Sequence, residues 1–243
     1  MVGVKISFRR ELLAAIFSVV LSTGFCQIAV VPADGKNVLR DTSMITSELL
    51  ATLKTQYGKN KIYPAEMEKL VLYTLSFLPE LAEHKITFKV RPKGAPLSSR
   101  PDWGTLWRSA RKRRYMVFIH QGQDSSLFGS LFSRTSVPAK IGILGHELCH
   151  VSNFSRKTSM GLLGIGVAHI SKPYMDRFEF NTDSLVIEKG MGRYLREWSG
   201  MFDAMFSGTG DPFKNKNTPT GERYMSAATI QRYMEKSAYP GYR

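Results

Sequence analysis

The sequence contains little cysteine, few acidic residues compared with basic ones, and no apolar run long enough for an ordinary membrane span. Cys26 and Cys149 are the only cysteines among its 243 residues, so removal of an N-terminal leader would exclude an internal disulfide. Lysine and arginine together number 34 against 20 acidic residues, and the formal net charge is +14. This balance favours contact with an anionic surface such as lipid, acidic polysaccharide or nucleic acid, without identifying one of them.

The N-terminal residues have the pattern of an export signal. Lys5, Arg9 and Arg10 precede an apolar run over residues 12–25. A run of this length is too short for an ordinary membrane span and is typical of a signal-peptide core. We therefore predict a signal peptide over 1–26, with an uncleaved anchor as the alternative. The protein is then exported, as a periplasmic or secreted chain that is either soluble or bound at a membrane.

The rest of the sequence predicts a mainly helical α+β domain with a small antiparallel sheet. Residues 27–40 are expected to form a lead-in segment, and 41–243 one domain, because the sequence has no internal repeat or low-complexity segment. Alternating or continuous apolar residues predict strands at 86–90 and 115–120, with loops over 92–101 and 121–137. Apolar spacing, proline and glycine predict helices over about 44–57, 64–78, 138–154, 172–190 and 225–237.

The helix predicted over 138–154 contains His146, Glu147 and His150 in the pattern His-Glu-x-x-His. At positions i and i+4 the two imidazoles lie on one helix face, where both can bind one zinc ion. Glu147 flanks them and can take a proton from a zinc-activated water. This short pattern also arises by chance. The alternative interpretation is that the two residues are ordinary surface or core histidines. Cys149 points to a different sector and is predicted to be a small buried residue. An apolar stripe lies opposite the histidines and consists of Ile141, Leu144, Leu148 and Val151.

A catalytic zinc ion needs a third protein ligand. The extension His-x-x-Gly-x-x-His is absent, because Asn153 and Arg156 occupy the glycine and histidine positions. On the helix predicted over 172–190, Glu179 and Asp183 lie about 40° apart in the middle of a largely apolar face. Buried carboxylates without partners are costly, so each is expected to contact a cation or a hydrogen-bond donor. A zinc ion and a ligand imidazole are such partners for this pair, and local lysine or arginine is the alternative.

Together, His146–His150 and Arg177–Asp183 resemble the gluzincin class of zinc metallopeptidases, most closely the M48 type that includes Ste24 and HtpX. The resemblance covers about residues 113–190. Thr182 stands where that family prefers alanine. The membrane members of the family have several transmembrane helices, whereas this sequence has no such run beyond its leader.

The resemblance implies a zincin-like metallopeptidase domain and assigns roles to five residues. It also implies that the strand at 115–120 is the edge strand that pairs with a bound peptide. The implied zinc ligands are His146, His150 and Glu179, the implied general base is Glu147, and Asp183 is implied to hydrogen-bond a ligand imidazole.

The expected activity is therefore that of an exported zinc-dependent metalloendopeptidase, with Zn²⁺ as its cofactor, a zinc-activated water and Glu147 as general base. Its expected partners are a peptide or protein substrate and an anionic membrane surface, but not nucleic acid, which an exported chain rarely meets. Two alternatives remain: a basic zinc-containing binding protein without turnover, and a lipid- or polysaccharide-binding protein with a coincidental motif. The donor that would stabilise the transition state is open among His169, Arg193 and Tyr194.

Two further segments have unusual composition. Tryptophans stand beside a basic run in Trp103–Arg114, which predicts either a solvated charged segment or a contact with lipid or nucleic acid. Met160–Ala168 is wholly apolar or glycine and too short to span a bilayer. It is predicted to pack beside the active cleft, with contact to a membrane surface as the alternative.

Overall fold

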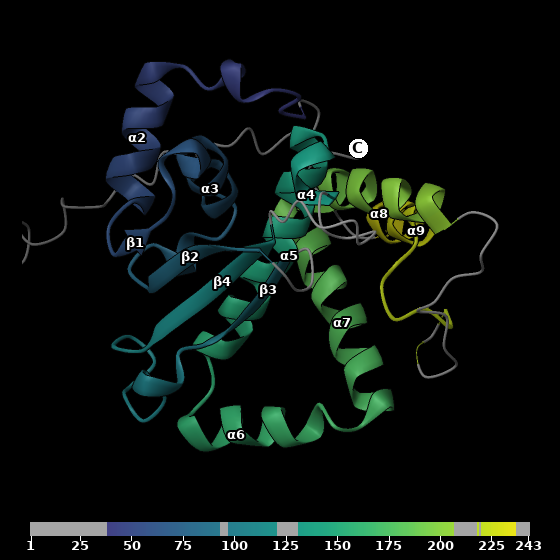
Figure 1. The fold of residues 1–243 in the computed structure, drawn as a ribbon. Coiled ribbons are helices and arrows are strands. Elements are labelled where there is room, and N and C mark those ends of the chain that lie inside the picture. Colours follow the sequence, from purple (N-terminus) through teal and green to yellow (C-terminus); the bar gives the residue numbers. More distant parts are fainter. Residues whose placement is uncertain (1–37, 93–96, 121–130, 207–217, 219, 237–243) are drawn as a thin grey trace, which may run out of the picture.

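A computed structural model describes residues 38–92, 97–120, 131–206, 218 and 220–236 (Figure 1). The predicted signal peptide and most of the predicted lead-in lie outside these residues. Within the described ranges, every helix is either too short or too polar to cross a bilayer.

The N-terminal part of the domain is helical, as predicted. A 3₁₀ turn at Thr42–Met44 precedes α2 (Ser47–Tyr57), and a second one at Ala65–Met67 precedes α3 (Glu68–Leu75). Both helices begin later than the sequence patterns suggest. Helix α2 begins after its cap residue Thr46, and the 3₁₀ turn at Ala65–Met67 occupies the expected first turn of α3. The Thr46 hydroxyl caps α2 by accepting a hydrogen bond from the backbone N–H of Leu49.

Four strands form one small sheet in the order β1-β2-β4-β3, and its pairing corrects the sequence prediction. The strands are β1 (Lys61–Ile62), β2 (Lys85–Arg91), β3 (Leu97–Pro101) and β4 (Arg114–His120). The sheet is mixed, because β1–β2 and β2–β4 are parallel and only β3–β4 is antiparallel. The prediction of an antiparallel sheet was wrong because the chain returns from β1 to β2 through α3, a crossover that makes the two strands parallel.

The predictions for strands β2 and β4 are confirmed, but the loop predicted over 92–101 contains β3. This strand has no apolar alternation, since only Leu97 and Pro101 are buried, and its Pro101 stands at its end, where a proline is tolerated. All residues of β4 from Tyr115 to His120 are buried, which explains its continuous apolar sequence.

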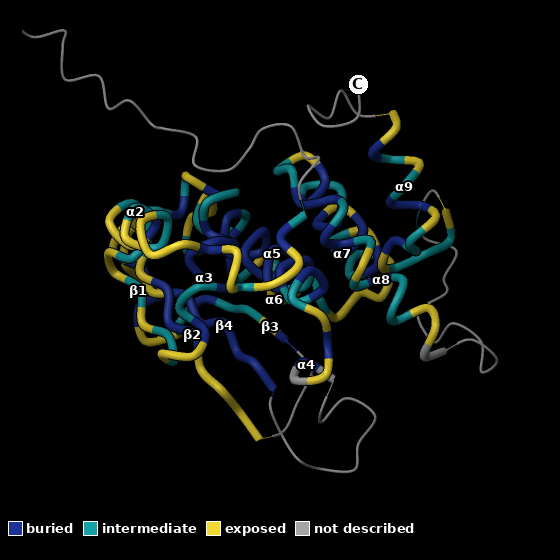
Figure 2. The backbone as a smooth tube through the Cα atoms, turned by 90° about the horizontal axis from the view of Figure 1, so that it is seen from above, coloured by how far each residue is buried: buried dark blue, intermediate teal, exposed yellow. Residues whose placement is uncertain are grey.

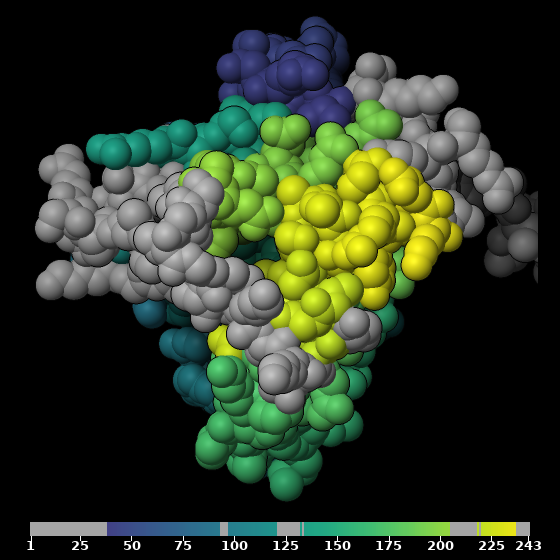
Figure 3. Space-filling view, turned by 90° about the vertical axis from the view of Figure 1, so that its right-hand side faces the viewer, coloured from purple at the N-terminus to yellow at the C-terminus, as the bar shows by residue number. Residues whose placement is uncertain are grey.

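Most of the described residues after β4 are helical. The predicted helices at 138–154 and about 225–237 are confirmed as α5 (Val137–Ser155) and α9 (Ala227–Lys236). The apolar segment at 160–168 forms a further helix, α6 (Ser159–Ala168), which together with the start of α7 makes the lower end of the molecule (Figures 1 and 3). Part of the loop predicted at 121–137 is the short helix α4 (Leu131–Arg134), and residues 121–130 lie outside the described part.

The helix predicted over 172–190 ends earlier than expected. Its regular part is α7 (Lys172–Val186), and a wider turn over Ile187–Met191 leads directly into α8 (Gly192–Phe206). Gly190 has a φ of 90°, which only glycine adopts readily, so it acts as a kink between two helices and not as a simple stop.

Helix α5 lies at the centre of the fold and packs against α3, α7, α8 and β3 (Figures 1 and 2). Its predicted apolar stripe is fully buried. The backbones of α5 and α8 approach so closely that a Cβ atom on Gly142 would lie 2.3 Å from the carbonyl oxygen of Tyr194. The mainly helical α+β class predicted from the sequence is thus confirmed, with the sheet on one side of α5 and α7–α9 on the other.

Candidate metal centre

Helix α5 presents two histidines to the interior of the domain. The hydroxyl of Ser136 caps the helix by accepting a hydrogen bond from the N–H of Ala139, which sets the first turn ahead of the motif. One helical turn separates His146 from His150, and their rings meet edge to face with centroids 4.7 Å apart. They are 3% and 6% exposed, and their Nε2 atoms lie 3.0 Å apart.

Helix α7 brings Glu179 to the same point. Its Oε2 atom lies 3.1 Å from Nε2 of His146 and 3.1 Å from Nε2 of His150. The three atoms therefore form a nearly equilateral triangle. A tetrahedral zinc site with bonds of about 2.0–2.1 Å places its ligand atoms about 3.3 Å apart, so the triangle has the size that a small metal ion requires. This buried group can hold a metal ion.

Each imidazole is oriented by a second side chain of α7. Asp183 Oδ1 lies 2.7 Å from Nδ1 of His146, and its other oxygen accepts a hydrogen bond from the N–H of Met225. Thr182 Oγ1 lies 3.3 Å from Nδ1 of His150 and itself donates to the carbonyl of Phe178. Because both Nδ1 atoms face acceptors, both Nε2 atoms can direct a lone pair at the metal position.

The hydrogen bond between Thr182 and His150 was not predicted from the sequence, where Thr182 is noted only as a departure from the family pattern. The signal was nevertheless present, since Glu179, Thr182 and Asp183 are spaced i, i+3 and i+4 on one helix face. The hydrogen bond between Asp183 and a ligand imidazole, which the resemblance implies, is present at His146.

The imidazoles and carboxylates of the cluster shift the pKa values of one another. Burial alone would raise the pKa of Glu179, but the imidazoles of His150 and His146 outweigh it and hold this pKa well below its usual range. Burial alone would lower the pKa of His146, but hydrogen bonds to Asp183 and Glu179 outweigh it and raise this pKa. Glu179 is thus held as a carboxylate, the form that binds a metal ion.

Cys149 takes no part in the cluster. It is fully buried, as predicted, and burial raises the pKa of its thiol. A thiol kept protonated in this way is a packing residue and not a metal ligand.

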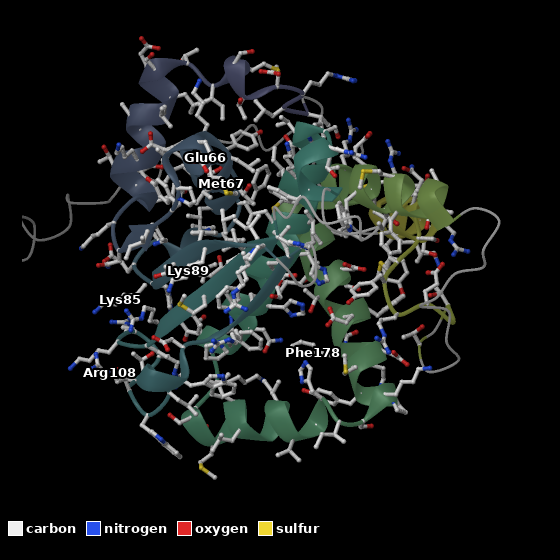
Figure 4. All side chains as sticks on the ribbon, viewed as in Figure 1. Glu66, Met67, Lys85, Lys89, Arg108 and Phe178 are labelled. Carbon is white, nitrogen blue, oxygen red and sulfur yellow. The ribbon has the colours of Figure 1, made fainter. Side chains whose placement is uncertain are left out.

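A pocket of about 610 Å³ opens onto the cluster and is lined by Glu147, which is 6% exposed. Segments from β3, α5, α7, α8 and residues 224–226 form its wall. Figure 4 shows Phe178 on the inner side of α7, and its ring stacks on that of His150 with centroids 5.0 Å apart. Most of the wall is apolar, with Leu97, Ile143, Phe154, Phe178, Leu195, Trp198, Phe202 and Met225.

The edge strand beside the pocket is β3 and not β4, which corrects the expectation drawn from the resemblance. Strand β4 lies between β2 and β3, so its backbone is paired on both sides. Strand β3 pairs only with β4 among the described strands, and Leu97, Ser98 and Ser99 line the pocket. The strand that is free to pair with a bound segment therefore lies in the region predicted as a loop.

Two of the three candidate donors lie away from the pocket. Tyr194 is buried, and its hydroxyl accepts a hydrogen bond from the N–H of Leu39 and contacts the hydroxyl of Tyr73. Arg193 also lies outside the pocket wall, whereas His169 lines it.

Tyr224 also lines the pocket, and it was not predicted from the sequence as a site residue. Its ring lies 5.9 Å from that of His146 between centroids. Although 41% of the residue is exposed, burial at the phenol and the nearby charges of Glu179 and Glu147 raise its pKa above the usual value. The phenol therefore keeps its proton at neutral pH and can donate a hydrogen bond. No local pattern marks this tyrosine, because the chain returns to the site only after α8.

Comparison of the chain with protein-family models, with curated proteins and with solved structures gives no match. The geometry of the site is therefore the only basis for assigning a function to the chain.

Proposed function

We propose that the chain is an exported zinc-dependent metalloendopeptidase similar to the M48-type gluzincins. The observation that supports this proposal most directly is the triangle of His146, His150 and Glu179, whose ligand atoms lie 3.0–3.1 Å apart in a buried pocket. Glu147 lies on the wall of the same pocket. The pocket thus contains three side chains that can bind a metal ion and, beside them, the carboxylate of Glu147, which is not one of the proposed ligands.

The donor set favours zinc. Two imidazole nitrogens and one carboxylate oxygen suit a borderline-soft ion, whereas Mg²⁺ and Ca²⁺ prefer oxygen ligands alone. Three protein ligands leave one position of a tetrahedron for a reactant, which distinguishes a catalytic zinc site from a structural one. When bound, zinc would lower the pKa of a water molecule and polarise the carbonyl of the substrate.

The residues of the chain supply the remaining steps. Glu147 takes the proton of the attacking water and returns it to the leaving amine. With a metal ion bound, Asp183 and Thr182 would accept the Nδ1 protons of the two imidazoles and so hold them in the tautomer whose Nε2 binds the metal. A protonated donor is needed where the carbonyl oxygen becomes negative, and Tyr224 and His169 are the candidates on the pocket wall.

The pocket favours an extended polypeptide as substrate. A peptide can add to the edge of β3 that no described strand occupies, through main-chain hydrogen bonds, with alternate side chains directed into the pocket. The apolar wall favours an aliphatic or aromatic side chain at the position that enters it.

The decisive test compares Glu147→Gln with Glu188→Gln, a matched change at an exposed residue after α7. We expect the wild type to hold about one zinc ion per chain and to degrade casein. Glu147→Gln should keep the zinc and lower the cleavage rate about 10²–10⁴-fold, because only the proton transfer is removed. Glu188→Gln should behave as the wild type.

Metal analysis by mass spectrometry and casein degradation on gels measure both quantities. Zinc binding without cleavage by the wild type would favour a binding protein without turnover. Wild-type protein with well under one zinc per chain would overturn both zinc-based functions.

A further inference from the structure

Several large hydrophobic side chains are exposed together at one end of the molecule. Among the large hydrophobic residues that the structure describes, Ile170 is the most exposed at 87%, followed by Trp107 at 72%, Val167 at 69% and Met160 at 68%. Trp103 lies on the same loop as Trp107 and is 51% exposed. We call these five residues the apolar end. Isolated exposed hydrophobics are ordinary, but a group of this size marks an interaction surface.

The two parts of the apolar end are joined by hydrogen bonds. The guanidinium of Arg113 donates to the carbonyl of Lys157 and to the hydroxyl of Ser159, at 3.2 and 3.3 Å. The hydroxyl of Ser159 donates to the carbonyl of Leu106 at 2.7 Å. The start of α6 is therefore fixed against the loop that holds both tryptophans. Figure 1 places this loop and α6 at the same lower end, and Figure 4 places Arg108 there too.

Helix α6 has a buried side and an exposed apolar side. Leu162 is buried against the domain, whereas Met160, Gly164 and Val167 follow one another at spacings of four and three on the exposed side. The exposed side contains no charged residue. The apolar sequence of α6 is therefore only partly explained by packing, although packing was the interpretation favoured from the sequence.

The surroundings of the apolar end are basic. The stretches 103–113 and 156–175 contain no acidic residue. Among the described residues, Arg108, Lys112 and Lys157 are exposed and form no ion pair. Further exposed cations in these stretches are Arg111, Arg156 and Lys172.

We propose that the apolar end docks on the surface of an anionic lipid bilayer. The helix α6 has 10 residues and a length of about 15 Å, half the hydrocarbon thickness, so it would lie in the plane of the interface. Its exposed side and Trp107 enter the headgroup region, where tryptophan is favoured, and the surrounding cations contact lipid phosphates.

A bilayer fits this surface better than nucleic acid does. Three of the five residues of the apolar end are Met160, Val167 and Ile170, whose side chains provide no plane on which a base can stack. Exposed cations flank these residues in the tryptophan loop, before α6 and at the start of α7, which matches a layer of anionic headgroups above an apolar interior. The docking surface is separate from the metal cluster, so the proposal stands whether or not the site hydrolyses peptides. His169, just after α6, also lines the pocket, so docking would hold the pocket near the bilayer.

Vesicle flotation of the full chain tests the proposal, with phosphatidylcholine vesicles compared with vesicles that contain a third phosphatidylglycerol. The triple variant Trp107→Ser, Val167→Ser and Ile170→Ser removes the apolar contacts. The matched control is Met44→Ser with Ile62→Ser, at exposed hydrophobic positions elsewhere on the surface. Residues 1–26, predicted to be a leader, are present in all three proteins, so any contribution from them is the same in each measurement.

We expect the wild type and the control to bind anionic vesicles alike, and the triple variant to bind them at least about 10-fold more weakly. All three should keep the same circular dichroism spectrum and melting temperature, because the changed residues are exposed. Equal vesicle binding by the triple variant and the wild type would overturn the proposal. So would equal losses in the control and the triple variant, or wild-type binding to a short DNA duplex with none to anionic vesicles.

Discussion

Helices α5 and α6 have similarly apolar, glycine-containing sequences but opposite surroundings. Residues 141–145 of α5 are Ile-Gly-Ile-Leu-Gly, and residues 161–166 of α6 are Gly-Leu-Leu-Gly-Ile-Gly. Most of α5 is buried and it contains the histidine pair, whereas Leu162 is the only buried residue of α6. Apolar composition therefore does not decide burial. The number of neighbouring elements that cover a helix decides it.

The glycines show the physical difference. A Cβ on Gly142 would meet the backbone of α8 at 2.3 Å, and one on Gly145 would meet the sulfur of Met191 at 2.6 Å. Within the described part of the chain, no atom lies within 4 Å of such a Cβ on Gly164 or Gly166. Gly142 and Gly145 of α5 allow close helix packing, whereas Gly164 and Gly166 of α6 face no described atom. Packing on all sides holds the two histidines of α5 in fixed positions, which a metal centre requires.

The largest difference between the helices is expected in metal binding. His146→Ala on α5 removes one corner of the triangle and should weaken zinc binding by more than the roughly 10–100-fold that loss of a supporting hydrogen bond causes. His169→Ala, just after α6, should leave the zinc content unchanged, because its Nδ1 contacts the carbonyl of Ile165 and not the cluster. Competition with a chromogenic chelator measures both affinities. Equal zinc affinity in the two variants would refute the assigned cluster.

The next largest difference between α5 and α6 is expected in how substitutions change the free energy of unfolding. Leu148→Ala on α5 opens a cavity at a fully buried site and should lower the free energy of unfolding by about 2–5 kcal/mol. Val167→Ala on α6 removes atoms that already face water and should change it by less than about 0.5 kcal/mol. Urea denaturation followed by circular dichroism gives both values. A loss of more than 1–2 kcal/mol at Val167 would mean that α6 is covered in solution.

The smallest changes in stability are expected from two glycine substitutions, and these changes should have opposite signs. Gly142→Ala forces α5 away from α8 and should destabilise the fold by about 1–3 kcal/mol. Gly164→Ala meets no neighbour and should stabilise it by about 0.4–1 kcal/mol, because alanine restricts the unfolded chain and favours the helix. The two melting temperatures should therefore move in opposite directions. Destabilisation by both substitutions would contradict the open surroundings of α6.

The residues of the candidate site followed from helix geometry to a large extent. The spacing of His146 and His150 places both on one face of α5, and the face of α7 that holds Glu179 and Asp183 was recognisable because acids stood among apolar residues. The structure brings these four residues together. Thr182 was visible at the same spacing, but its role depends on a hydrogen bond to the other helix.

Other features could not be predicted because they depend on partners far away in the sequence. Strand β3 has no apolar alternation and becomes a strand through its pairing with β4. The sheet is mixed because of the path taken between its strands, which local patterns do not specify. Tyr224 reaches the pocket only after the chain has completed α8.

By itself, the sequence determined which residues share a helix face, because helical hydrogen bonds repeat every few residues and fix those faces locally. It thus determined the pairing of the two histidines and of the two acids. Only the tertiary structure decided that these faces meet and that β3 and not β4 is the edge strand at the pocket. It also decided that no described element covers the exposed side of α6. The physical reason is that each of these outcomes depends on which apolar surfaces bury one another, and several pairings of the same faces satisfy the same local pattern.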